Sequence, residues 1–182
     1  MQSMLPNPLH PAVVHFPVVL AVLLPFFTAG ALWAIRRGTT PRRAWAIPVA
    51  VSLALALSAW VAVQTGEAQD ERVERVVAEQ PLEAHEEAAE LFLALSGGLA
   101  LLVVAGLVRG RTGQVARGLA TVGAVALVAV AAQVGHSGGQ LVYRYGAAGA
   151  YTGVQNPGSA SAMTSVGERA APAGAARRHR ED

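Results

Sequence analysis

Four long, predominantly apolar stretches restrict the fold of this chain more than any other feature. A helix needs about 20 such residues to cross a bilayer, in which every backbone polar group must be bonded internally. Hydrophobic residues make up 53% of the 182 residues and charged residues only 14%, against about a quarter charged in soluble domains. The sequence therefore predicts an all-α integral membrane bundle of four transmembrane helices, over residues 12–35, 44–64, 91–108 and 118–134.

The first stretch is expected to be a retained helix rather than a cleaved signal peptide. The ten residues that begin the chain contain no Arg or Lys, whereas a signal peptide carries a positive segment there. Arg36 and Arg37 follow the stretch where small residues would mark a cleavage site.

Charges in the connections predict the orientation of the helices. Cytoplasmic loops are enriched in Lys and Arg. The first and third connections hold no acid and seven Arg, namely Arg36, Arg37, Arg42, Arg43, Arg109, Arg111 and Arg117. Residues 66–90, in the middle connection, hold nine acids against Arg72 and Arg75. We therefore expect a multi-pass protein of the bacterial plasma (inner) membrane, with both termini exterior.

The chain divides into a transmembrane domain, residues 1–151, and a tail, residues 152–182. The tail is rich in Ala, Gly, Ser, Pro and Arg without an apolar period, which predicts a disordered exterior segment. The two halves of the domain share one pattern, a hairpin that turns at an Arg-rich loop and returns to a Gly-containing end. This pattern is consistent with a parallel duplication.

Composition excludes several functions. All 14 basic residues are Arg and the net charge is only +2, which does not suggest nucleic-acid binding. The absence of Cys excludes disulfides, thiolate nucleophiles, iron–sulfur clusters and covalent c-type haem. A cofactor would therefore be held by His, carboxylate or backbone groups, and the lipid bilayer is an expected partner.

Four of the five histidines are expected at the same exterior membrane edge. His10 and His15 lie at the start of the first helix, His85 lies just before the third and His136 at the end of the fourth. His179 falls among Arg residues of the tail. Ionisable groups at a membrane edge are candidate functional residues, although interfacial histidines also bond headgroups or helix ends.

Helical spacing predicts which way these side chains point. His85 shares a stripe with Leu82, Ala89 and Phe92 and should point inward. Beneath His136 lie Ala132, Ala129 and Val125, small enough to leave room for a flat ligand or a neighbouring helix, and His15 is at a depth at which it could face His136. His10 and His15 are five residues apart, which places them about 140° apart on a helix. Glycines 66, 97–98 and 135–139 are either close-packing points or space for a macrocycle.

Several motifs together resemble one known family. They are LHPAVVHFP at residues 9–17, Thr65-Gly66, His85-Glu86 and GHSGGQLVYRYG at residues 135–146. The chain thereby resembles the bacterial membrane proteins grouped as domain of unknown function 2231, over residues 9–146. The resemblance implies a four-helix membrane fold without an assigned activity. Relatives that carry cytochrome-like or Rieske-like domains imply a redox setting by association.

Three functions are consistent with these features. The leading hypothesis is an electron-transfer module that binds haem b non-covalently through His10, His15, His85 and His136, with a quinol or an exterior redox protein as its partner. The second is a transition-metal site built on His15, His85 and His136, because imidazole suits copper, zinc, iron and nickel, and Glu86 or Glu87 could add an oxygen ligand. The third is a non-catalytic subunit of a membrane complex, in which the histidines only hydrogen-bond across helices. No substrate-handling motif names a reaction, so whether the protein is an enzyme stays open.

Overall fold

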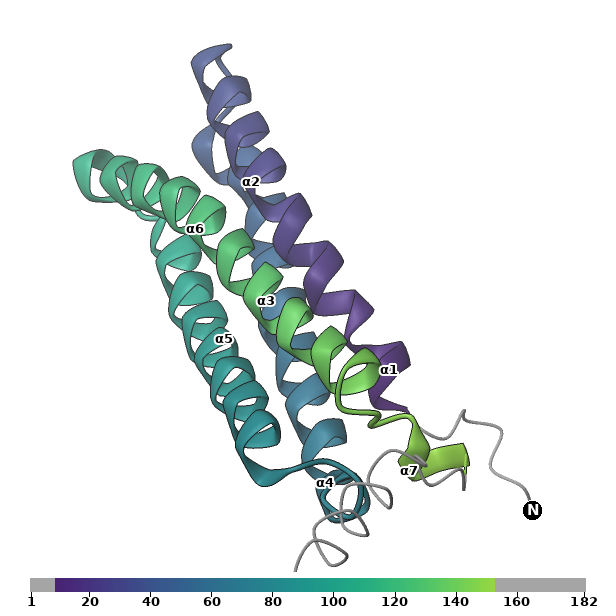
Figure 1. Cartoon of the computed structure of the whole chain (residues 1–182). Helices are drawn as coiled ribbons and strands as arrows, with labels where there is room; N and C mark the ends of the chain where they lie inside the picture. Colours follow the sequence, from purple (N-terminus) through teal and green to yellow (C-terminus); the bar gives the residue numbers. More distant parts are fainter. Residues whose placement is uncertain (1–8, 153–182) are drawn as a thin grey trace, which may run out of the picture.

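The protein is a bundle of four long helices, seen in a computed structural model that describes residues 9–152. The long helices are α2 (His15–Arg36), α3 (Pro41–Glu67), α5 (Glu79–Ala105) and α6 (Gly110–Tyr143). Three one-turn helices lie together at one end of the bundle (Figure 1), namely α1 (His10–Val13), α4 (Asp70–Val73) and α7 (Gly149–Thr152). Four helices, with α1 and α2 counted as one, are long and apolar enough to cross a membrane. This confirms the predicted all-α architecture.

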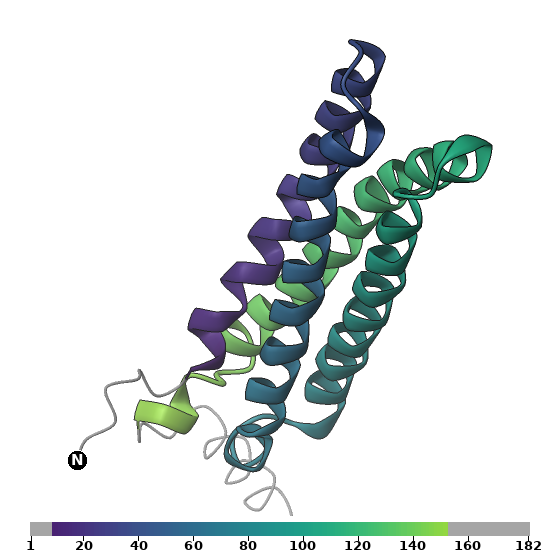
Figure 2. The ribbon, with the colours of Figure 1, turned by 180° about the vertical axis from the view of Figure 1, so that it is seen from behind.

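The long helices form two antiparallel hairpins, α2–α3 and α5–α6. α3 also packs against α5 and α2 against α6, so that each helix contacts two others. The turns of both hairpins lie at one end, here called the Arg end, and the one-turn helices lie at the opposite end, here called the His end (Figures 1 and 2). In both views the two turns lie apart from each other at the Arg end.

Proline and glycine set the turns of the hairpins. Pro41 is the first residue of α3, where its fixed φ suits a helix and its missing N–H costs nothing. Gly38 and Gly110 adopt φ of +99° and +79°, a conformation strained for residues with a side chain. Each short connection can therefore reverse the chain within a few residues.

Alanines make up about half of the central buried core, and large apolar residues cover the outside of the bundle. The buried core includes Ala21, Ala59, Ala120, Ala124 and Ala131, which let helix backbones approach closely. Leu101, Phe26 and Val122 are 75%, 72% and 68% exposed. An apolar exterior of this kind is suited to lipid rather than to water.

Trp45 joins the two hairpins at the Arg end, and Arg117 joins α6 to the end of α5 within the second hairpin. Trp45 is fully buried, and its indole Nε1–H donates to the Val103 carbonyl at 2.8 Å. Arg117 is 5% exposed and donates to the carbonyl of Gly106, which follows the last residue of α5. A cation is favourable at that end of the helix dipole. Arg117 was expected in the connection, but it lies inside α6 and caps a helix.

The helices extend beyond the apolar stretches that predicted them. α5 begins at Glu79 rather than at residue 91, and α6 covers residues 110–143 rather than 118–134. Hydropathy identifies only the part of a helix that is suited to lipid. The helix continues beyond that part because Ala, Glu and Gln also favour helix formation. The predicted tail beyond Thr152, with His179, lies outside the described residues.

Candidate ligand site at the His end

His10 connects the first helix to the end of α3. Its ring is half-buried, with Nδ1 2.9 Å from the Ala62 carbonyl oxygen and 3.4 Å from Thr65 Oγ1. A carbonyl oxygen can only accept, so Nδ1 carries the proton. The ring lies against Gly66, where an added Cβ would be 3.2 Å from ring atom Cε1. Gly66 therefore makes room for an imidazole.

His85 makes the corresponding contact between α5 and α6. Its Nδ1 lies 2.8 Å from Ser137 Oγ, and that hydroxyl donates to the Val134 carbonyl at 3.0 Å. Because the hydroxyl proton is used in this way, His85 Nδ1 is the donor to Ser137. The ring lies against Gly138, where a Cβ would be 3.1 Å from Cε1. The inward direction predicted for His85 agrees with this position.

The same three-residue arrangement thus occurs once in each hairpin, and we call it the His–hydroxyl–Gly unit. The first unit contains His10, Thr65 and Gly66, and the second contains His85, Ser137 and Gly138. Thr65 Oγ1 donates to the carbonyl three residues earlier at 3.0 Å, as Ser137 does. The repetition supports the interpretation that the hairpins are duplicates. The motifs Thr65-Gly66 and GHSGG stood out in the sequence, but no role was assigned to the Thr65 and Ser137 hydroxyl groups, although a hydroxyl residue directly before a glycine at both helix ends was a visible signal.

Both imidazoles are held in the tautomer that suits a ligand. With Nδ1 protonated, the neutral ring has its lone pair on Nε2, and ligating histidines are commonly oriented by an Nδ1–H bond of this kind. Within residues 9–152, neither Nε2 has a hydrogen-bond partner. The two rings are also within electrostatic reach of each other. The site therefore offers two oriented nitrogen donors from different hairpins.

Asp70 on α4 lies within electrostatic reach of His10 and beside Glu86 of α5. Burial raises the pKa of Asp70 on α4, and the carboxylates of Glu67 and Glu74 raise it further, while the His10 charge and a side-chain hydrogen bond with Glu86 lower it. Two carboxyl groups in contact cannot both ionise cheaply. The sequence pattern of the acidic connection suggested a solvated face, with Glu86 or Glu87 as an added oxygen ligand, and gave no indication of the interaction of Asp70 with His10 and Glu86.

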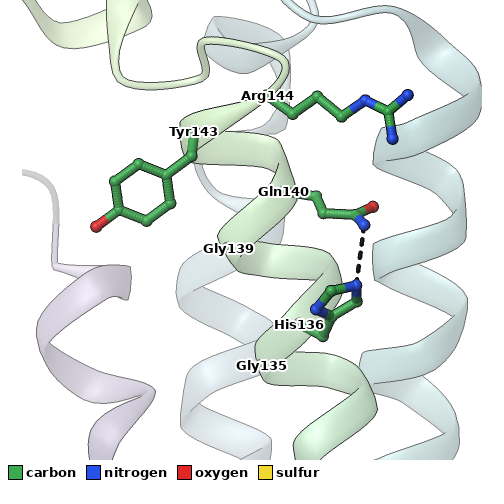
Figure 3. A pocket seen from close by; sticks show the side chains of 6 residues that line it. All are labelled: Gly135, His136, Gly139, Gln140, Tyr143 and Arg144. Carbon is green, nitrogen blue, oxygen red and sulfur yellow. Dashed lines mark hydrogen bonds between the residues drawn. The ribbon is translucent and has the colours of Figure 1, made fainter.

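His15 and His136 lie on the outside of the bundle, and the expected inward direction of His136 is not found. Both side chains are exposed, and Nε2 of His136 accepts from the Gln140 amide at 2.9 Å (Figure 3). Ala132, Ala129 and Val125, beneath His136, are exposed as well. An open hollow of about 590 Å³ on this face is lined by Gly135, His136, Gly139, Gln140, Tyr143 and Arg144. The hollow includes neither His10 nor His85.

No ready-made metal centre occurs in the described part of the chain. Among residues 9–152, no group of three or more His, Cys, Asp or Glu side chains is placed to hold a metal ion. The two oriented imidazoles and the nearby carboxyl pair are the donors that the His end provides.

The fold and these contacts define a multi-pass membrane bundle of two similar hairpins, with paired histidines at one end. The chain belongs to a family described as predicted membrane proteins (DUF2231), whose sequence profile matches residues 6–150. This confirms the resemblance drawn from the sequence motifs. Comparison with curated proteins found no match, and comparison with solved structures found none either.

Proposed function

We propose that the His end binds haem b non-covalently, that Nε2 of His10 and Nε2 of His85 would hold it, and that the protein serves in electron transfer. The observation that carries this proposal is the shared tautomer of the two rings. In each ring Nδ1–H is committed to an oxygen, which leaves the Nε2 lone pair for a ligand. Histidine is a common protein ligand of haem iron, and the His end supplies two oriented imidazoles.

His15 and His136 have a lesser part in this proposal. They are exposed, and the Nε2 lone pair of His136 is already used by Gln140. Because the hollow on α6 includes neither ligand ring, the haem would sit at the open His end. At that position it would be within reach of a quinol from the bilayer or of an exterior redox protein. Haem supplies reversible one-electron chemistry, and the chain supplies the ligands and their orientation.

The carboxyl pair favours a second candidate, a transition-metal site. A metal ion there would take a nitrogen ligand from His10 and oxygen ligands from Asp70 and Glu86. This combination of ligands suits several divalent metals. These groups do not form a three-ligand set among residues 9–152, so the side chains would have to move to enclose an ion.

Spectroscopy and metal analysis of protein purified from haem-replete membranes test both candidates. We expect wild-type protein to show an intense Soret band and sharp reduced bands, which H10A and H85A lose or shift. The variants H15A and H136A are matched controls, exposed histidines at the same end, and should keep the spectrum. S137A keeps both ligands but releases His85 Nδ1, and should shift the reduction potential.

The remaining outcomes distinguish the haem site, the metal site and a purely structural role. Stoichiometric metal without a Soret band would replace haem by the metal site. Loss of the spectrum in H15A or H136A, with H10A unaffected, would show that the ligand pair is wrong. Colourless, metal-free wild-type protein would defeat both ligand proposals and favour a subunit in which the His–hydroxyl–Gly units only hold the hairpins together.

A further inference from the structure

A groove at the Arg end lies at the opposite end of the bundle from His10 and His85. Its lining is apolar except for one arginine. It has a volume of about 580 Å³ and is lined by Arg42, Ala46, Val49, Ala50 and Leu53 of α3 and by Leu107, which follows α5. One wall thus comes from each hairpin. Its lining residues at the start of α3 and just after α5 place the groove at the Arg end.

The length of the groove matches one leaflet of a bilayer. Arg42, Ala46, Ala50 and Leu53 recur at helical spacing and form one stripe along α3. From Arg42 to Leu53 the helix rises about 16 Å at ~1.5 Å per residue. The hydrocarbon core of a bilayer is about 30 Å thick, so this is about half of it. Ala46, Ala50 and Leu53 are exposed, so the stripe is open to the lipid along its length.

Charge at the mouth of the groove selects the kind of lipid. Arg42 is exposed at the start of α3, and in the described chain no acid lies between residues 9 and 66 or between 91 and 152. The other exposed cations of this end are Arg36, Arg37, Arg43, Arg109 and Arg111. A guanidinium group binds phosphate oxygens through two parallel hydrogen bonds, and basic pockets between membrane helices favour anionic headgroups.

We propose that this groove is a binding site for one anionic phospholipid. The lipid phosphate pairs with Arg42, and one acyl chain lies along Ala46, Ala50 and Leu53 against Leu107. The remaining Arg residues attract anionic lipid to this end without contacting the bound molecule. The site is independent of any ligand at the His end.

Native mass spectrometry of the full chain in detergent, titrated with lipid, tests this site. Phosphatidylglycerol should be retained in preference to phosphatidylcholine with the same acyl chains. R42Q should weaken phosphatidylglycerol binding about five- to tenfold, which corresponds to about 1 kcal/mol for one cation near a headgroup. R36Q removes the same charge from the same hairpin turn, at the end of α2 and outside the groove, and should retain nearly the wild-type affinity.

A variant that fills the groove separates headgroup binding from acyl-chain binding. A50W should abolish retention of the lipid while the protein remains monodisperse. Equal retention of both lipids by wild-type protein would overturn the proposal. So would equal losses in R36Q and R42Q, which indicate a diffuse basic surface. Full retention by monodisperse A50W would show that the acyl chain does not occupy the groove, and if A50W is not monodisperse, the comparison of R42Q with R36Q decides.

Discussion

The imidazole of His85 packs so closely on Gly138 that a Cβ added to this glycine would lie 3.1 Å from Cε1 of the ring. The same ring donates through Nδ1 to the adjacent Ser137 hydroxyl at 2.8 Å. The glycine therefore sets how near the ring comes to α6, and the hydroxyl sets its rotation. Since His10 repeats both contacts on α3, the direction of each Nε2 is fixed by the packing of a hairpin.

Replacing Gly138 or Gly66 by Ala should therefore displace an imidazole. The imidazole has to move by a few tenths of an ångström to accommodate the added methyl group. The free-energy cost of this movement cancels the ~0.8–1 kcal/mol of stability that a Gly→Ala substitution otherwise adds inside a helix. G135A is the matched control, because a Cβ there meets no atom within 4 Å. Thermal unfolding in detergent should rank G135A above wild type, and G138A and G66A at or below it. A G138A variant as stable as G135A would show that the ring is not confined.

Loss of the hydroxyl should affect the two units unequally. S137A removes the only acceptor of His85 Nδ1–H in the described chain and should cost about 0.6–1.7 kcal/mol, the range for hydrogen bonds between membrane helices. T65V should cost less, because His10 retains the Ala62 carbonyl at 2.9 Å. Nitrogen-15 NMR of histidine-labelled protein reads the tautomers directly. Equal effects of the two substitutions would contradict the assigned donors.

The sequence predicted the membrane helices from the length of apolar stretches, and it predicted one of the inward histidines from the helical period. Apolar length identified the spans, and the stripe of Leu82 and Phe92, both buried in the structure, correctly directed His85 inward. The same reasoning failed for His136. The small residues beneath it suit a lipid-facing surface as well as a packed interface, so their size alone gave no direction.

The partners of the histidines were beyond prediction for a different physical reason. Which carbonyl or hydroxyl a ring meets depends on how two helices distant in sequence are placed along each other. The contact of His10 with Ala62 bridges 52 positions, and no local pattern encodes it. The role of Arg117 was missed in the same way, because a loop cation and a buried cap look alike until the end of α5 is located.

Trp45 should be the tryptophan that matters for stability. W45F loses the bond to the Val103 carbonyl and part of a fully buried ring, and we expect a cost of about 1–2 kcal/mol. Trp60, on the same helix, is 52% exposed, and W60F serves as the control with a change near zero. Chemical or thermal unfolding in detergent measures both variants. Similar values for the two would mean that the buried bond does not join the hairpins.

The Asp70 carboxyl should make stability depend on pH. Its folded pKa is raised above the ordinary value of 3.8, chiefly by burial and then by Glu67 and Glu74, against the effects of His10 and Glu86. Below pH 3.8 both the folded and unfolded forms hold the proton, and the raised pKa has no effect on stability. As the pH rises through the folded pKa, ionised Asp70 destabilises the folded state relative to the unfolded chain.

D70N removes this ionisation, and its advantage in unfolding temperature over wild type should grow from acid pH and level off above the folded pKa. E71Q, which changes the neighbouring residue of α4, is the control and should follow the wild-type profile. Unfolding midpoints measured across pH in one detergent give the comparison. An advantage of D70N that is greatest in acid would mean that the pKa of Asp70 is lowered rather than raised.

Orientation in the membrane determines where each site acts, and fusions to truncated chains can measure it. Both hairpin turns lie at the Arg end, and no acid accompanies their exposed Arg residues in the described chain. Because such loops stay on the cytoplasmic side, a fluorescent protein fused after Arg37 or Arg111 should fluoresce, and alkaline phosphatase should be inactive there. The reverse is expected after Glu74. Active phosphatase after Arg37, with fluorescence after Glu74, would place the lipid groove in the outer leaflet and direct His10 and His85 toward the cytoplasm, away from any exterior redox partner.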